Sequence, residues 1–579
     1  MKMNLRILLG KSVFISSVVL ILHLVACDNS GPIDVADSIY YNGDIITMTG
    51  NGPDSVEAVA TRDENIIAIG SLEDLGPYYG DSTTLIDLKG TTLLPGFIDS
   101  HLHPMLATIL IQTYILAFND WSLPHGDFKG VKDEEAYLNA LVSAVSNHNF
   151  DDKPFISWGY HNLFHGEIGK NKLDELFPDV PVIIWQYSFH EVRMNSIAID
   201  LLNIDYKAAM LHHQVDILDG RFYETGLAEM VFPKLAPDIL NPTDAARGMS
   251  LTAKAIQKGG ITTVGDMAMP LINFDMELQL LKGVLDNEAV PFRTYVIPNA
   301  RLFASSTNEL ESAFNVIDSL GKYNSDKLQF LRQIKLFADG AFYAQLMQMK
   351  EPYLDGHEGE WMMEPEMLRD YAEFFWNKDY RIHVHANGDK GVEVTLDILE
   401  DLQTKSPKSD HRFTFHHLGY TEKEQVERMA ALGAHASIQP YYVYAIASKY
   451  SESGLGEERA QNISPVGFLI ENGIVTCFHS DFFMAPSEPL TLMWAAVNRK
   501  TIDGKTFGRE LKVSPWEALK AVTINAAKHL SQEHHIGTIE VGKKADFVIL
   551  DQNPLKVDPE LIKDIQVLKT IYEGQAFAQ

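Results

Sequence analysis

Apolar and polar positions follow two different periodic patterns along the chain. At both ends, in residues 37–94 and 537–579, short runs alternate apolar with polar residues and are separated by turn residues, as in Val56-Glu57-Ala58-Val59. Alternation and β-branched residues are typical of antiparallel strands. We therefore expect the two ends to pair into one small β-sandwich domain that brackets a larger one.

Between the ends, strand-like apolar runs alternate with longer stretches of helical periodicity, the pattern of an α/β protein with parallel strands. The predicted strands are Phe155–Trp158, Val182–Trp185, Thr262–Gly265, Phe292–Ile297, Gln333–Phe337, Arg381–His385, Arg412–His416, Ala434–Ile438 and Ile474–Phe478. The predicted helices are Thr243–Lys258, Met276–Asn287, Glu364–Lys378, Lys390–Thr404, Glu422–Leu432 and Pro515–Leu530.

Residues 1–26 have the form of an export signal. Basic residues precede the apolar run Val13–Ala26, which is short for a membrane span. The run ends in Leu24-Val25-Ala26-Cys27, which resembles the processing box of bacterial lipoproteins. That resemblance implies a lipid on Cys27, a tether over residues 27–36 and a membrane-anchored protein of the bacterial cell envelope that faces the periplasm. A plain secretory signal with an incidental cysteine is the alternative.

The net charge limits the possible binding partners, and the cysteine count limits the possible disulfides. The chain has 78 acidic and 48 basic residues, a net charge of −30. This balance argues against nucleic acid or an anionic membrane surface as a partner. The chain has 2 cysteines, Cys27 and Cys477, so lipidation of the first leaves no pair for an internal disulfide.

A His-x-His pair follows the first apolar run of the central domain. Side chains two apart on a strand share a face, so His101 and His103 can reach one metal ion as neutral nitrogen ligands. In a chain with 21 histidines the pair alone is weak evidence, and two polar residues at a strand end are the alternative.

Later predicted strands also carry polar residues. Lys335 interrupts an apolar strand, and a buried ammonium must lose its charge or find a partner. Taken alone, the lysine could equally reach the strand end and water. His416 and His417 are adjacent, so a strand would turn them to opposite faces. His385 ends one further predicted strand, and Asp481 follows another.

Two segments carry a family resemblance. PGFIDSHLHP at 95–104 and GTIEVGKKADFVILD at 537–551 together resemble the metal-dependent amidohydrolase superfamily. The resemblance implies a (β/α)8 TIM-like barrel over residues 95–536. A plain barrel needs about 250 residues, so we expect a large insertion, at about residues 110–245.

The resemblance also implies a metal centre with two divalent ions, zinc being the expected metal. In the superfamily, the lysine equivalent to Lys335 is carboxylated and its carbamate bridges the metals. His101, His103 and Asp481 would complete one site, and the other would be held by His385 and His417. His416 stands where the family usually has Glu. Asp481 would also act as general base and pass its proton to the leaving nitrogen.

One branch fits the expected insertion best. Phe155–Tyr160, Leu173–Pro178 and His190–Ser196 resemble the N-substituted formamide deformylase-like enzymes, of the amidohydrolase family 3 type. By that resemblance His190 reaches toward the substrate carbonyl or its leaving group. A buried histidine that joins insertion segments is the alternative.

We therefore expect a small-molecule hydrolase that cleaves a non-peptide carbon–nitrogen bond, as in an N-formyl or N-acyl amide, and that forms a homodimer. A cyclic amide or ester hydrolase, an isomerase, or an inactive binding lipoprotein with the same fold are the alternatives.

Overall fold

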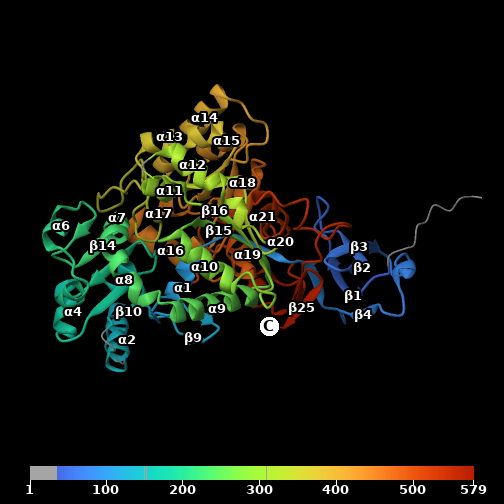
Figure 1. Ribbon diagram of the computed structural model, residues 1–579, viewed down its shortest axis with the longest axis horizontal. Coiled ribbons are helices and arrows are strands. Elements are labelled where there is room, and N and C mark those ends of the chain that lie inside the picture. Colours follow the sequence, from blue (N-terminus) through green and yellow to red (C-terminus); the bar gives the residue numbers. More distant parts are fainter. Residues whose placement is uncertain (1–34, 149, 151–152, 308, 579) are drawn as a thin grey trace, which may run out of the picture.

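The computed structural model describes residues 35–148, 150, 153–307 and 309–578. The predicted signal peptide and Cys27 lie outside these residues. Figure 1 shows a central α/β body with a small β-rich lobe on one side and an inserted lobe on the other. In the part of the chain that is described, no helix has the length and apolar character needed to cross a membrane.

A parallel barrel forms the body. Its strands, in order, are β6 (Phe97–Leu102), β15 (Ile261–Met269), β16 (Arg293–Pro298), β18 (Gln333–Phe337), β19 (Arg381–Ala386), β20 (Thr414–His417), β21 (His435–Ile438) and β22 (Thr476–Phe478). Neighbours pair in parallel from β6 to β16 and from β18 to β22. Short strand β17 (Leu328–Phe330) pairs with β16 and leads into β18.

Two contacts close the ring of strands. A parallel bridge between Asn299 and Lys335 joins the end of β16 to β18. After β22, the N–H of Asp481 donates to the carbonyl of His101 in β6 at 3.0 Å. The predicted barrel fold is confirmed, and the second contact brings two predicted ligands together through their backbones.

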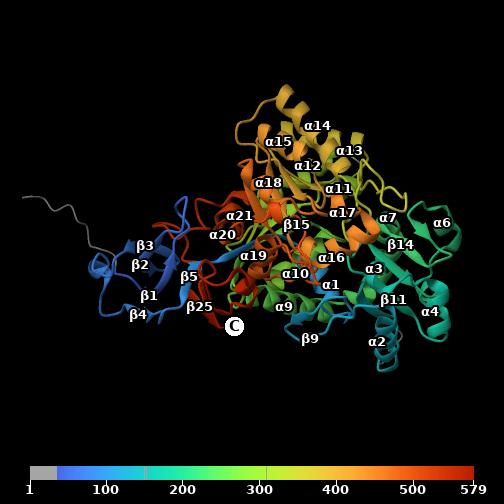
Figure 2. The ribbon, with the colours of Figure 1, turned by 180° about the vertical axis from the view of Figure 1, so that it is seen from behind.

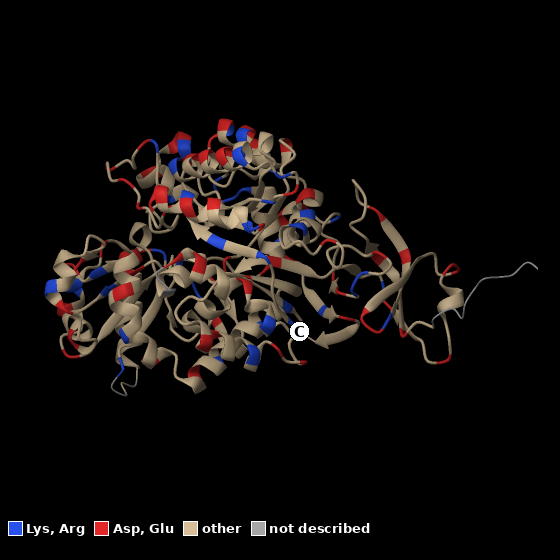
Figure 3. Ribbon diagram, turned by 45° about the horizontal axis from the view of Figure 1, so that its top comes forward, with Lys and Arg blue, Asp and Glu red and all other residues tan. Residues whose placement is uncertain are grey.

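Helices cover the outside of the barrel much as predicted. They include α9 (Pro242–Lys258), α10 (Phe274–Val284), α13 (Pro365–Asn377), α14 (Asp389–Lys405), α15 (Lys423–Ala431) and α19 (Pro489–Asn498). Charges of both signs are interspersed on outer helices (Figure 3), as in the sequences of α13, α14 and α15. Arg428 of α15, for example, contacts Glu393 at 2.8 Å and Asp397 at 2.7 Å on α14.

The prediction of one helix over Pro515–Leu530 is wrong. The segment forms two helices, α20 (Pro515–Ala521) and α21 (Ile524–His529), because Thr523 leaves the helical region with φ −132° and ψ −103°. Helix α21 lies at the amino-terminal end of the barrel, where Asn525 donates to the carbonyl of Thr476 at 3.0 Å and Leu530 accepts from Gln333 at 3.2 Å.

The insertion lies between α1 (Pro104–Leu110) and α9 and has its own mixed sheet. The strand order is β13 (Val215–Asp216), β14 (Arg221–Tyr223), β12 (Glu191–Met194), β11 (Val182–Gln186), β10 (Phe155–Tyr160) and β7 (Tyr114–Ile115). Helix α2 (Glu134–Ser146) packs Tyr137 and Leu141 against β10 and β11 in a separate buried cluster. Figure 2 shows the insertion on the side of the barrel opposite to β1–β4.

Strands from both ends of the chain pair in one eight-stranded sheet, as expected. These are β1 (Ser38–Ile46), β2 (Ser55–Arg62), β3 (Asn65–Gly70), β4 (Thr84–Asp87), β5 (Thr92–Pro95), β23 (Phe547–Leu550), β24 (Val567–Tyr572) and β25 (Gln575–Ala578). The central contact is antiparallel, with Leu94 opposite Val548. Both faces are apolar, since Tyr40 and Val59 belong to one buried cluster and Ile39 and Ala58 to another.

Candidate metal centre

The predicted ligands lie where the barrel strands end. His101 is in β6, and His103 follows it as the N-cap residue of α1. The others lie on or just after later strands, namely Lys335 in β18, His385 in β19, His417 in β20 and Asp481 after β22. Active sites of such barrels form at this end. The fold therefore brings the predicted ligands into one region.

His101, His103 and Asp481 turn their donor atoms toward one another. Nε2 of His101 lies 3.3 Å from Nε2 of His103. Oδ1 of Asp481 lies 3.2 Å from Nε2 of His103 and 3.7 Å from Nε2 of His101. A tetrahedral zinc ion with bonds of about 2.0–2.1 Å spaces its ligand atoms about 3.3 Å apart. The three donor atoms therefore fit one face of a divalent ion.

Lys335 is buried beside these residues, with 1% of its surface exposed. Its Nζ has no hydrogen-bond partner among the described residues. Burial lowers the pKa of Lys335 to about 7, against the opposing charge of Asp481. An uncharged amine is the form that reacts with CO2, so burial puts this lysine in a suitable state to be carboxylated.

His385 and His417 form a second pair of donors. Their ring centres lie 4.3 Å apart, and both side chains are buried. Nδ2 of Asn387 lies 2.9 Å from Nε2 of His385. Nδ1 of His417 lies 3.7 Å from Oδ2 of Asp481, so this carboxylate faces both groups of histidines.

Both histidines at the end of β20 reach the interior. Strict alternation breaks because His417 adopts a left-handed backbone conformation, with φ 75°. Nδ1 of His416 then lies 2.8 Å from Nδ1 of His101, whereas His417 faces Asp481. Asp481 is also left-handed, with φ 50°. Such strain costs about 1–3 kcal/mol per residue and is concentrated at functional sites.

Three buried histidines of the centre favour the neutral form. Burial, followed by the charge on Lys335, lowers the pKa values of His101, His385 and His416 well below 6.5. Neutral imidazole is the form that binds metal ions. Ligand atoms also converge within 4.8 Å in two further groups, His101–His416–His479 and His383–His416–His529.

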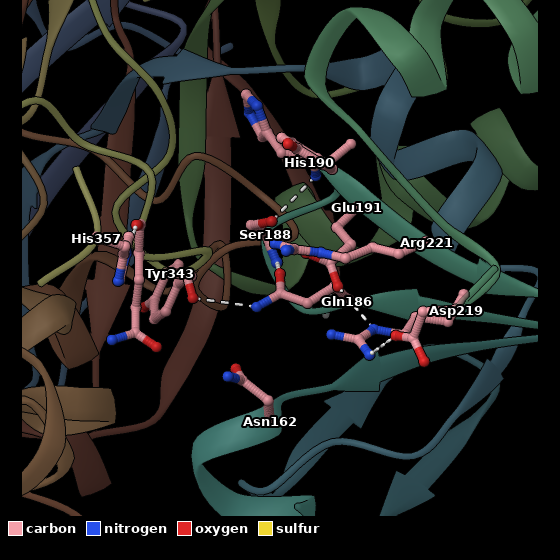
Figure 4. Close-up of polar contacts among 12 residues, drawn as sticks. Asn162, Gln186, Ser188, His190, Glu191, Asp219, Arg221, Tyr343 and His357 are labelled. Carbon is pink, nitrogen blue, oxygen red and sulfur yellow. Dashed lines mark hydrogen bonds and ion pairs between the residues drawn. The ribbon is translucent and has the colours of Figure 1, made fainter. Parts of the chain in front are cut away.

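His190 enters the region from the insertion, through the turn between β11 and β12 (Figure 4). Its N–H donates to Ser188 at 3.0 Å, and the N–H of Ser188 donates to Gln186 at 2.6 Å. The amide of Gln186 in turn donates to the carbonyl of Tyr343, in the loop after β18, at 3.0 Å. The turn is thus tied to the barrel, and the ring of His190 lies 6.4 Å from that of His385.

Glu224, which sequence reasoning missed, binds the other side of His190. Its Oε2 lies 2.8 Å from Nδ1 of His190. Burial acts to lower the pKa of His190, but the charge and hydrogen bond of Glu224 outweigh it, so the pKa is raised. The two residues are 34 positions apart in the sequence, so no local spacing pattern predicts that they pair.

Asp99 holds the last barrel strand to the first. It accepts from the backbone N–H of Ser480 at 3.1 Å and from the Ser480 hydroxyl. Burial raises the pKa of Asp99 to about 6, although these hydrogen bonds oppose the shift. The residue therefore supports the position of Asp481, next along the chain, without facing the centre's donor atoms.

Comparison with known proteins gives the same family as the sequence motifs. Residues 84–578 match the family described as the Amidohydrolase family. The chain is 26% identical over 561 residues to the Bacillus subtilis protein YtcJ, covering 93% of this chain and 98% of the relative. It is 22% identical over 560 residues to N-substituted formamide deformylase of Arthrobacter pascens, covering 93% and 97%.

A solved structure matches in fold. It is a metal-dependent hydrolase from Pyrococcus horikoshii OT3, with a TM-score of 0.67 and 23% identity, and the match covers 90% of this chain and 99% of that chain.

Proposed function

The chain belongs to the amidohydrolase family, and we therefore propose that it hydrolyses the carbon–nitrogen bond of a small N-formyl or N-acyl amide. The predicted enzyme class, a hydrolase acting on carbon–nitrogen bonds, is confirmed by that membership. One observation carries the proposal: the donor atoms of His101, His103 and Asp481 lie 3.2–3.7 Å apart beside the buried amine of Lys335.

The donor set fits two divalent ions. His101, His103 and Asp481 would hold one ion and His385 with His417 the other, and a carboxylated Lys335 would supply further oxygen donors. When bound, such ions lower the pKa of water and polarise a carbonyl group. Imidazole and carboxylate donors suit zinc.

Asp481 is the proposed general base. Burial acts to raise its pKa, but the contact with His103 lowers it below the ordinary value, so the carboxylate stays ionised at neutral pH. One oxygen faces His103 and the other faces His417. The carboxylate can therefore take a proton from attacking water and deliver it to the departing nitrogen, as general acid–base catalysis requires.

His190 is the proposed second catalytic group. Glu224 holds its Nδ1 and favours the protonated ring, which leaves Nε2–H as a donor for the substrate carbonyl or the departing nitrogen. Similarity to a formamide deformylase over nearly the whole of both chains supports a small acyl group as the part that is cleaved.

The test uses the chain without residues 1–27, purified with zinc and bicarbonate, beside Lys335→Ala. We expect about two zinc ions per chain, falling in the variant, and turnover of N-formyl or N-acetyl amines above that of matched esters and lactams. A metal-loaded protein that cleaves only esters or lactams would contradict the proposed amide substrate. A chain that binds no metal would contradict the proposed metal-dependent hydrolysis.

We also propose that the protein is exported and anchored in the bacterial cell envelope by a lipid on Cys27. The support is the segment Leu24-Val25-Ala26-Cys27 after a basic and then apolar lead.

A further inference from the structure

A line of hydrogen-bonded side chains runs from His101 toward the amino-terminal end of the barrel. Nδ1 of His101 lies 2.8 Å from Nδ1 of His416, and Nε2 of His416 lies 3.0 Å from Nδ1 of His383. Nε2 of His383 lies 2.8 Å from Oε1 of Gln333. The amide of Gln333 donates to the carbonyl of Leu530 at 3.2 Å.

We infer that this line, from Gln333 through His383 and His416, fixes the tautomer of His101 so that its Nε2 carries a free lone pair toward the metal centre. The inference rests on the proposed role of His101 as a metal ligand. It makes Gln333, His383 and His416 positioning residues.

The direction of donation is set at Gln333. Its Nε2 must face the carbonyl of Leu530, because the reversed amide would place two oxygen acceptors 3.2 Å apart. Oε1 therefore faces His383 and can only accept, so Nε2 of His383 carries the proton. A neutral imidazole has one N–H, and Nδ1 of His383 is then an acceptor.

The same rule propagates along the line. Nε2 of His416 donates to Nδ1 of His383, which makes Nδ1 of His416 an acceptor. Nδ1 of His101 must then donate to His416, and Nε2 of His101 is left unprotonated. That nitrogen is the atom 3.3 Å from His103 and 3.7 Å from Asp481. Partners on the far nitrogen of a ligand histidine fix its tautomer and ring orientation in this way.

A second metal site at His383, His416 and His529 is the rival explanation for the same cluster. Both nitrogens of His529 lack a hydrogen-bond partner among the described residues. However, both nitrogens of His416 and of His383 already have partners within 3.0 Å. An ion held by the facing nitrogens, Nδ1 of His383 and Nε2 of His416, would break the bond between them, so the geometry favours the positioning line.

The first experiment measures zinc affinity by competition with a chromophoric chelator. Gln333→Leu removes the acceptor at the start of the line, and we expect its zinc dissociation constant to rise by about 10–100-fold. Gln333→Glu keeps an oxygen for His383 and, protonated in this buried position, an O–H that donates to the carbonyl of Leu530, so it should restore affinity to within about threefold of wild type. His529→Phe is the matched control, since that ring packs edge-on against His383 but makes no hydrogen bond to it.

Three outcomes would overturn the inference. Unchanged affinity in Gln333→Leu would show that the line does not act on His101. Failure of Gln333→Glu to restore affinity would mean that Gln333 acts through side-chain packing and not through its hydrogen bond to His383. Loss of one zinc per chain in His529→Phe would reveal the second metal site.

The second experiment reads the tautomer of His101 directly in the unsubstituted chain. Solid-state NMR of the metal-free chain labelled with ¹⁵N-histidine separates protonated from unprotonated ring nitrogens, with His101 assigned through His101→Asn. We expect His101 as the Nδ1–H tautomer, and an Nε2–H tautomer would overturn the inference. A chain that binds no zinc yet shows Nδ1–H at His101 would instead contradict the proposed function alone.

Discussion

Glu224 and His190 bind each other through both side chain and backbone. Oε2 of Glu224 lies 2.8 Å from Nδ1 of His190, and the N–H of Glu224 donates to the carbonyl of His190 at 2.9 Å. Glu224 adopts a positive φ of 45° to make both contacts, and its side chain is 3% exposed. A buried carboxylate held in this way fixes both the orientation and the charge of the imidazole.

Glu224→Gln should move the alkaline limb of the pH profile. In wild type the pKa of His190 is raised above 6.5, so activity that needs the protonated ring is present below that pKa and lost as pH rises through it. Without the carboxylate, burial dominates and the pKa falls below 6.5. The alkaline limb of kcat/KM should therefore shift to lower pH, and an unmoved limb would exclude His190 as the acid.

Asp481→Asn should separate chemistry from metal binding. The amide keeps an oxygen donor near His103 but cannot accept a proton from water, so we expect most of the metal to remain while kcat falls by about 10²–10⁴-fold. Metal analysis and steady-state kinetics on one preparation measure both. A fall in kcat that follows the fall in metal content would make Asp481 a ligand only.

Glu533→Gln should lower the free energy of unfolding at neutral pH but not in acid. Arg412, which comes just before β20, donates two hydrogen bonds to Glu533, at 2.7 and 3.0 Å. Burial acts to raise the pKa of Glu533, but Arg412 lowers it below 4.5. The stabilisation is therefore present above pH 4.5 and lost as pH falls through the folded-state pKa.

The expected loss for Glu533→Gln is about 1 kcal/mol in the free energy of unfolding at pH 7, shrinking toward zero in acid. Urea unfolding of both proteins at pH 7 and pH 3 measures it. An equal loss at both values would assign the effect to packing.

Cys27→Ala should release the protein from the membrane fraction of a bacterial host without reducing specific activity. The thiol is the proposed attachment point of the lipid, and the described domains begin well after it. Cell fractionation measures the release from the membrane, and activity assays on each fraction measure the specific activity. A variant that stays with the membranes would place the anchor elsewhere, and an inactive soluble variant would contradict a simple tether.

The parallel α/β pattern could be predicted because strand-like apolar runs such as Gln333–Phe337 alternate with helical stretches, whereas the barrel was expected from the family resemblance. The rule that neighbouring side chains alternate failed at one place, His416 and His417, since the left-handed conformation of His417 is a local turn that periodicity does not record. Helical periodicity likewise ran through Thr523, where the backbone breaks. Glu224 and Gln333 were missed because their partners are distant in sequence.

The pairing of β5 with β23 has a consequence for the growing polypeptide. Pairing between segments distant in sequence is slow, and a nascent chain has no Val548 to place opposite Leu94 until residues 95–547 have been synthesised. Gly96 follows β5 directly, donates to the carbonyl of Asp546, and leads into the strand that carries His101. A chain that ends before Asp546 lacks this support for the strand that carries His101, and we expect truncated products to be inert rather than partly active.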